Sequence, residues 1–217
     1  GSGVLDSPAA GSRTIVNTNT LAISDGSGIA SNYTLTNGTL TMTIVPRPTT
    51  VSGTKTYDGT TNVSSSNLTS FSNLAGSDTL SISGTGTISS ADVGTGKSVN
   101  TSGITIDNSS GVGSNYTLSS ASVNVTKRVI SLNGVRAFDG TNNASSTDLS
   151  ISNLVSGENL TLSGSGTVPN ATVEMNKAIT LGSLSISDGS GGKSSNYSLT
   201  GGSHTLDISQ LSVNVSG

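Results

Sequence analysis

The stretch Lys55-Thr56-Tyr57-Asp58-Gly59-Thr60-Thr61-Asn62 occurs twice in this chain. It returns, with changes, as Arg136-Ala137-Phe138-Asp139-Gly140-Thr141-Asn142-Asn143, so that the two aromatic residues lie 81 positions apart. Glycine readily adopts a positive φ, and an aspartate oxygen can close an Asx turn, so Asp-Gly predicts a tight turn beside the ring. The 81-residue period indicates a chain built from tandem repeats.

A second motif, Ser-Asn-Tyr, occurs three times and ends in Tyr33, Tyr116 and Tyr197. These tyrosines are 83 and 81 positions apart, which matches the period of the first motif. The two motifs together divide the chain into four parts: the C-terminal half of a repeat (1–45), two full repeats (46–126 and 127–210) and the start of a further repeat (211–217).

Alternating apolar residues dominate each repeat, as in Leu80-x-Ile82, Ile104-x-Ile106 and Val123-x-Val125. A period of two places one set of side chains inward and the other toward water, which is typical of β-strands. Good helix formers are scarce, with two Glu and one Gln in the whole chain. We therefore predict an all-β protein, in which each repeat is a small immunoglobulin-like β-sandwich and the repeats form an elongated rod. The alternative is a β-solenoid, that is, a parallel β-helix.

Composition argues against several kinds of partner. The net charge is −3 and the nine basic residues are scattered, whereas nucleic-acid binding needs a clustered basic face. No apolar run is long enough to span a bilayer, so we expect no membrane insertion. The absence of Cys excludes a disulfide framework and a thiolate metal site.

Six motifs follow one another in residues 53–118: Lys55-x-Tyr57-Asp58-Gly59, Leu74-x-Gly76-Ser77-Asp78-x-Leu80, Gly84-Thr85-Gly86, Ala91-Asp92-Val93-Gly94-x-Gly96-Lys97, Gly103-Ile104-Thr105-Ile106 and Ser114-Asn115-Tyr116. This order resembles the YDG-type haemagglutinin repeat of filamentous-haemagglutinin-like bacterial adhesins, which use two-partner secretion. The second copy departs from it, with Phe138 for Tyr, Glu158 for Asp, and Val173-Glu174-Met175-Asn176 for Val-Gly-x-Gly.

The resemblance implies a repeat array of a large secreted protein, located on the bacterial cell surface or in the extracellular matrix. Such an array would serve cell adhesion and biofilm formation as a stalk that holds a binding tip away from the cell. Its expected partners are neighbouring repeats of the same chain, with polysaccharide or a host or cell-surface ligand as further candidates. We expect neither an enzyme nor a cofactor.

For the aromatic-Asp-Gly motif we predict a structural role at Tyr57, Asp58, Gly59, Phe138, Asp139 and Gly140. Phe138 favours this interpretation, because an apolar ring fills space but cannot donate a hydrogen bond. The alternative function is that the repeats themselves bind extracellular polysaccharide or self-associate. Tyr33, Tyr116 and Tyr197 are then the candidate ligand contacts as well as structural motif residues.

Three further features have a structural and a functional interpretation. Loops at Asp25, Asp107 and Asp188 read as turns, and Ca²⁺ is the alternative, although Ca²⁺ prefers six to eight oxygen ligands. Lys97 and Lys177 recur at matching positions, where we expect the stem to cover the core and the amine to meet a carboxylate; an isopeptide cross-link is the alternative. His204 is the only histidine, and we expect it in an exposed loop.

Overall fold

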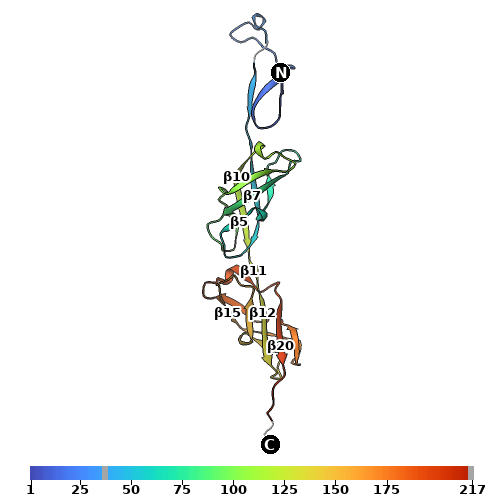
Figure 1. Cartoon of the computed structure of the whole chain (residues 1–217), viewed down its shortest axis with the longest axis vertical. Helices are drawn as coiled ribbons and strands as arrows, with labels where there is room; N and C mark the ends of the chain where they lie inside the picture. The colour runs from blue at the N-terminus through green and yellow to red at the C-terminus, as the bar shows by residue number, and fades with distance from the viewer. Residues whose placement is uncertain (36–38, 215–217) are drawn as a thin grey trace. The chain divides into compact units, whose positions relative to one another are not determined.

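The computed structural model describes residues 1–35 and 39–214 (Figure 1). Its regular structure consists of β-strands joined by loops and by short 3-10 turns, so the all-β prediction is confirmed. Among the described residues, no helix has the length and apolar character needed to cross a bilayer. The last three residues of the expected segment 211–217 lie outside the described part.

The chain divides into two compact units. Unit 1 comprises residues 1–53, 62–87 and 98–123, and unit 2 comprises residues 54–61, 88–97 and 124–217. This division differs from the repeat boundaries drawn on the sequence. Two segments of the first full repeat, 54–61 and 88–97, belong to the same compact unit as the second full repeat.

The first sheet of unit 1 is antiparallel and has the order β1-β2-β3. A second antiparallel sheet has the order β5-β7-β9. The strands of these sheets are β1 (Val4–Leu5), β2 (Gly11–Asn17), β3 (Thr41–Ile44), β5 (Asn62–Ser64), β7 (Leu80–Thr87) and β9 (Ile104–Asn108). The alternating runs at Leu80 and Ile104 thus form neighbouring strands, with Ile82 opposite Ile106.

The first full repeat also contributes a four-stranded sheet in the order β6-β4-β10-β8. Its strands are β6 (Leu68–Ser72), β4 (Arg47–Thr56), β10 (Tyr116–Thr126) and β8 (Gly94–Ser98). The alternation in β10 follows the period-two expectation, because Ala121, Val123 and Val125 are buried.

In unit 2 the main sheet has the order β14-β12-β20-β17. Its strands are β14 (Leu149–Ser152), β12 (Ser131–Ala137), β20 (His204–Ser209) and β17 (Glu174–Ala178). Strands β12 and β20 are parallel (Figure 1). Their register is continuous from Leu132, opposite His204, to Ala137, opposite Ser209. This central parallel pair differs from the expectation, because the sheets of an immunoglobulin-like sandwich are antiparallel.

The remaining strands of unit 2 form three two-stranded pairs: β13 (Asn143–Ser145) with β16 (Ser165–Thr167), β15 (Leu160–Ser163) with β18 (Ser185–Asp188), and β11 (Arg128–Val129) with β19 (Tyr197–Ser198). One apolar core draws side chains from the main sheet, from β13 and from residues that border the other strands. Its buried members are Leu132, Ala144, Leu149, Val168, Ile179, Leu184, Leu206 and Ile208. The core explains how the unit holds together without cysteine.

Candidate functional site

The Ser-Asn-Tyr motif has the same local structure in all three copies. A 3-10 turn precedes each tyrosine: η1 (Ala30–Asn32), η3 (Gly113–Asn115) and η5 (Ser194–Asn196). The tyrosine N–H donates to the carbonyl of the first residue of each turn. The side chains differ in exposure, with Tyr33 65% exposed, Tyr116 6% and Tyr197 1%.

The hydroxyl of each buried tyrosine meets a carboxylate. In unit 2, Tyr197 Oη donates to Glu158 Oε2 at 2.6 Å and accepts from the N–H of Val155 at 3.1 Å. In unit 1, Tyr116 Oη donates to Asp78 Oδ2 at 2.5 Å and accepts from the N–H of Ala75. We call the Ser-Asn-Tyr turn together with this carboxylate loop the head of a repeat.

Tyr57 of the first full repeat packs against the head of the second, inside unit 2. Its ring centroid lies 5.4 Å from that of Tyr197, with the rings nearly perpendicular, and Tyr57 is 5% exposed. Its hydroxyl donates to Glu158 Oε1 at 2.5 Å, so one carboxylate accepts from two tyrosines. Edge-to-face packing of this kind adds to the gain from burial.

The two hydroxyls bonded to Glu158 are held in the neutral form. Burial, followed by the hydrogen bond to Glu158, raises the pKa of Tyr197 to about 12. The same two causes, in the same order, raise the pKa of Tyr57 above its ordinary value. Ionising either hydroxyl would place a second negative charge beside the carboxylate. At neutral pH the two tyrosines therefore act as hydrogen-bond donors to Glu158 and not as reactive phenolates.

Asn196 makes a second contact between the two repeats within unit 2. Its Oδ1 accepts from the N–H of Val93 at 2.9 Å, and its Nδ2 donates to Asp92 Oδ1 at 2.9 Å. Lys193 completes the group with an ion pair to Asp92 at 2.7 Å. The hydrogen bond from Asn196, followed by that from Lys193, lowers the pKa of Asp92 to about 2. In unit 1, Asn115 accepts in the same way from the N–H of Ala10 at 2.8 Å.

Asp58 and Gly59 form the predicted tight turn. Asp58 Oδ1 accepts from the N–H and the hydroxyl of Thr60, and Gly59 has a φ of +76°. A Cβ on Gly59 would lie 2.7 Å from Val155 Cγ1, so a side chain here would collide with the head of the second repeat. The Asp139 turn has the same bonds to Thr141. We call the aromatic-Asp-Gly turn together with the loop at 91–93, or at 171–173 in the second copy, the tail of a repeat.

The acidic loops use their side chains to cap the turns that follow. Asp188 Oδ1 accepts from the N–H and the hydroxyl of Ser194, and Asp25 Oδ1 accepts from the N–H of Ala30. In the middle copy Asn108, and not Asp107, makes this bond, to Gly113. Within the described ranges no group of three or more His, Cys, Asp or Glu residues could hold a metal ion.

The two matching lysines have different partners. Lys177 is buried and donates to Asn170 Oδ1 at 2.7 Å, to the hydroxyl of Thr172 and to Glu174 Oε2 at 2.8 Å. Lys97 donates to the carbonyl of Ser90 at 2.9 Å, where the second copy has Asn170. The amine of Lys177 therefore meets a carboxylate as expected, whereas the amine of Lys97 bonds to a main-chain oxygen.

The expectation for His204 is wrong. His204 begins β20, it is half-buried, and its Nδ1 accepts from the N–H of Leu132 at 3.1 Å. Its Nε2 lies 2.8 Å from the carbonyl of Leu199, so both ring nitrogens are bonded to the main chain. The half-buried imidazole links β20 to the main chain of β12 and of the segment that follows β19.

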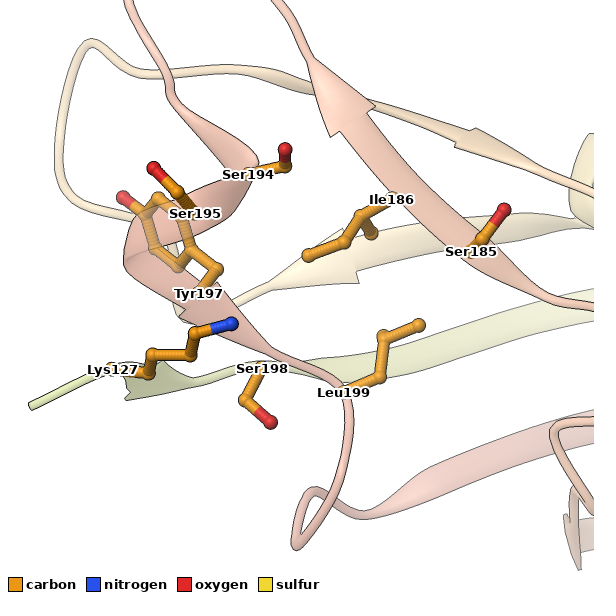
Figure 2. A pocket seen from close by; sticks show the side chains of 8 residues that line it. All are labelled: Lys127, Ser185, Ile186, Ser194, Ser195, Tyr197, Ser198 and Leu199. Atoms are coloured by element: carbon orange, nitrogen blue, oxygen red, sulfur yellow. The ribbon is translucent and has the colours of Figure 1, made fainter. Parts of the chain in front are cut away.

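A shallow hollow of about 430 Å³ lies beside Tyr197 in unit 2. Figure 2 shows Ile186 and Leu199 reaching into it, with Lys127 and the Ser194 and Ser195 hydroxyls nearby. Smaller hollows recur at one place in both full repeats: one is lined by Leu68, Phe71 and Ile82, the other by Leu149, Ile151 and Leu162. These hollows, and not the buried Tyr116 and Tyr197 rings, offer accessible surface.

The structure brings Tyr57 and Tyr197 together but places Tyr33 and Phe138 apart from such a cluster. The sequence pattern did not identify the other residues of the contact around Tyr57 and Tyr197, which are Glu158, Val155, Asn196 and Asp92. A signal was present, because each of these residues belongs to a motif that recurs in fixed order around the tyrosines.

The chain is thus an all-β protein of tandem repeats, in which the tail of one full repeat is buried against the head of the next. The family model of the YDG domain matches residues 39–123 and again residues 125–205. These matches span most of the chain, which therefore belongs to the YDG domain family. No curated protein and no solved structure matches it.

Proposed function

We propose that the chain is part of the stalk of a large secreted bacterial surface adhesin, in which YDG repeats hold a binding tip away from the cell. One observation carries this proposal: Tyr57 of one repeat is buried against the head of the next, where Gly59 lies against Val155 and the N–H of Val93 donates to Asn196. The aromatic and polar groups of this repeat are used in a contact with the next repeat, which is typical of repeats that stack end to end. The finer fold that we propose is a row of small β-sandwiches.

The parallel pair β12–β20 supports this arrangement. Strand β12, near the start of the repeat, ends at Ala137 beside Ser209, the end of the last strand, β20. Since both strands run in the same direction, the chain enters a repeat at its head and leaves it at its tail. A repeat of this topology passes the chain on to a neighbour at its opposite end. We therefore propose that each repeat contacts only its neighbours in the chain, as in other repeat proteins.

Small-angle scattering of the chain tests the rod. A compact globule of this length has a radius of gyration of about 17 Å, from the scaling for folded domains. We expect a value well above that figure, with a cross-section that fits a single repeat. A value near that of the globule would contradict the stalk.

Adhesion of cells that display the parent protein tests the function. Replacing the YDG array with an unrelated spacer of equal length should preserve adhesion, and shortening the array should reduce it. If an equal-length spacer abolishes adhesion, the repeats themselves bind the ligand.

The second candidate function is binding of extracellular polysaccharide by the repeats. It is favoured by the hollow that recurs in both repeats beside Phe71 and Ile151, because an array of equal sites would bind a polymer with avidity. Glycan arrays on the chain and on its Phe71→Ser variant test it. Binding that falls in the variant while the circular dichroism spectrum is unchanged would support this function over the stalk.

A further inference from the structure

The tail of the second repeat has the same backbone as the tail that is buried in unit 2. Phe138 N–H donates to the carbonyl of Ser209 at 2.8 Å, as Tyr57 N–H donates to that of Thr126 at 2.9 Å. Gly140 has a φ of +81°, close to the value at Gly59. The second tail is therefore already formed in the shape that the first tail has in its contact.

The two tails differ in what covers them. Phe138 is 39% exposed, against 5% for Tyr57. A Cβ on Gly140 would meet nothing within 4 Å, whereas one on Gly59 would strike Val155. Val173, which corresponds to Val93, is 47% exposed, and the neighbouring Met175 is 72% exposed. Within the described part of the chain, the N–H of Val173 has no hydrogen-bond partner, whereas that of Val93 donates to Asn196 Oδ1.

We propose that this tail face, consisting of Phe138, Gly140, Val173 and Met175, is a docking surface for the head of a further YDG repeat. The occupant is set by continuity with the contact inside unit 2. Its Ser-Asn-Tyr tyrosine packs on Phe138, its asparagine accepts from the N–H of Val173, and its carboxylate loop passes over Gly140. Phe138 and Met175 supply apolar area that is covered on docking.

The chemistry of Phe138 selects between two kinds of head. Glu158 accepts from its own Tyr197 and from Tyr57 of the tail that covers it. Phe138 has no hydroxyl, so a head that carries a glutamate would keep one carboxylate oxygen without its donor in the contact, which is costly. The shorter Asp78 is bonded by its own Tyr116 in unit 1. The tail face therefore fits a head whose carboxylate is an aspartate, as in unit 1, better than a head whose carboxylate is a glutamate, as in unit 2.

This inference rests on the proposed stalk function in taking another repeat as the partner. It is tested by amide exchange at single residues, and the stalk by scattering and adhesion, so that each can fail without the other. A stalk could have flexible links at this face, and a docked repeat could belong to a protein that is not an adhesin.

The test is an extended chain in which residues 1–217 are followed by a second copy of residues 54–127. Gly217 ends the segment Val215-Ser216-Gly217, which matches Val51-Ser52-Gly53, so the copy continues in register and carries an aspartate head. We expect the amide of Val173 to exchange at least several-fold more slowly than in the original chain, approaching the rate at Val93. Phe138→Trp gives a single tryptophan, whose emission should shift to shorter wavelength in the extended chain only.

Two variants of the appended copy separate docking from chance contact. Asn115→Ala removes the acceptor and should return Val173 to fast exchange. Asp78→Glu should weaken protection on Phe138, and Phe138→Tyr should restore it. Protection of Val173 that survives Asn115→Ala would overturn the proposal, because the contact would then be unspecific.

Unchanged exchange at Val173 beside protected core amides in the appended copy would also overturn it. If the appended copy shows no protected core, residues 135–210 with Glu158→Asp replace it as the appended head, and the same criterion applies. The exchange rate of the Val173 amide in this second extended chain then decides whether the tail face is a docking surface.

Discussion

The hydroxyl of Tyr57 is the clearest case of a single group on which the contact between repeats depends. Tyr57→Phe should lower the free energy of unfolding of unit 2 by about 1–3 kcal/mol, because the half-buried carboxylate of Glu158 loses one of its two tyrosine donors. Urea denaturation followed by far-ultraviolet circular dichroism measures this change. The control is Phe138→Tyr, which changes an exposed ring and should stay within about 0.5 kcal/mol. Equal effects of the two changes would mean that the bond to Glu158 contributes nothing.

Gly59 and Gly140 provide a second matched pair. Both have positive φ, so replacing either with Ala should cost roughly 1–2 kcal/mol of backbone strain. Gly59→Ala also forces a Cβ to within 2.7 Å of Val155, and overpacking of this kind costs typically 1–3 kcal/mol more. Thermal unfolding of the two variants measures the difference. If Gly140→Ala is as damaging as Gly59→Ala, the turn alone sets the cost.

The three Ser-Asn-Tyr tyrosines show what the residue pattern could and could not predict. The recurring motif locates the same 3-10 turn each time, because that turn depends on bonds between near neighbours. Exposure depends on partners far along the chain, so the motif alone could not separate Tyr33 from Tyr197. The partner of Tyr197 in the ring contact, Tyr57, lies 140 positions away.

At the scale of elements, η5 and the loop at Asp92 form a contact that depends on pH. The pKa of Asp92 is lowered from the usual 3.8 to about 2, so its bonds are fully present above pH 3.8 and are lost as the pH falls toward 2. We expect the melting temperature of the chain to fall over this interval. The loss should be smaller in Asp92→Asn, which keeps a side chain of the same size but has no charge to lose.

Other carboxylates also have lowered pKa values, among them Asp58, Asp139 and Asp188, and they remain in the Asp92→Asn control. The difference between the two titrations therefore reports on Asp92. Curves that run parallel from pH 4 to pH 2 would show that Asp92 is not bonded to Asn196 and Lys193 in solution.

Strands were predictable where their pattern is local. The alternating runs at Leu80, Ile104 and Val123 became parts of β7, β9 and β10, because a period of two is set by neighbouring residues. The parallel pairing of β12 with β20 was not predictable, since Leu132 and His204 are 72 positions apart and no local signal fixes their register. His204 was misplaced for the same reason: its two bonds go to main-chain atoms of Leu132 and Leu199.

At the scale of the whole molecule, cohesion has to come from cores and contacts between repeats, because the chain has no cysteine. Buried polar groups add to it in several places, such as Asn196 and Lys177. An isopeptide bond at Lys97 or Lys177 would be a covalent link that does not need cysteine. The surroundings of Lys177 decide which outcome to expect.

Lys177 lies beside Asn170 and Glu174, the three residue types that an isopeptide bond between lysine and asparagine uses. Its amine donates to three oxygens and forms an ion pair with Glu174, whose side chain is 61% exposed. Isopeptide formation needs a free amine lone pair and a buried acid that shuttles the proton, whereas the Lys177 amine is engaged by three oxygens and Glu174 is exposed to water. We therefore expect the intact mass of the chain to equal that of its sequence. A mass lower by one ammonia, absent in Lys177→Arg, would show that the bond forms and that this tail of the repeat is covalently reinforced.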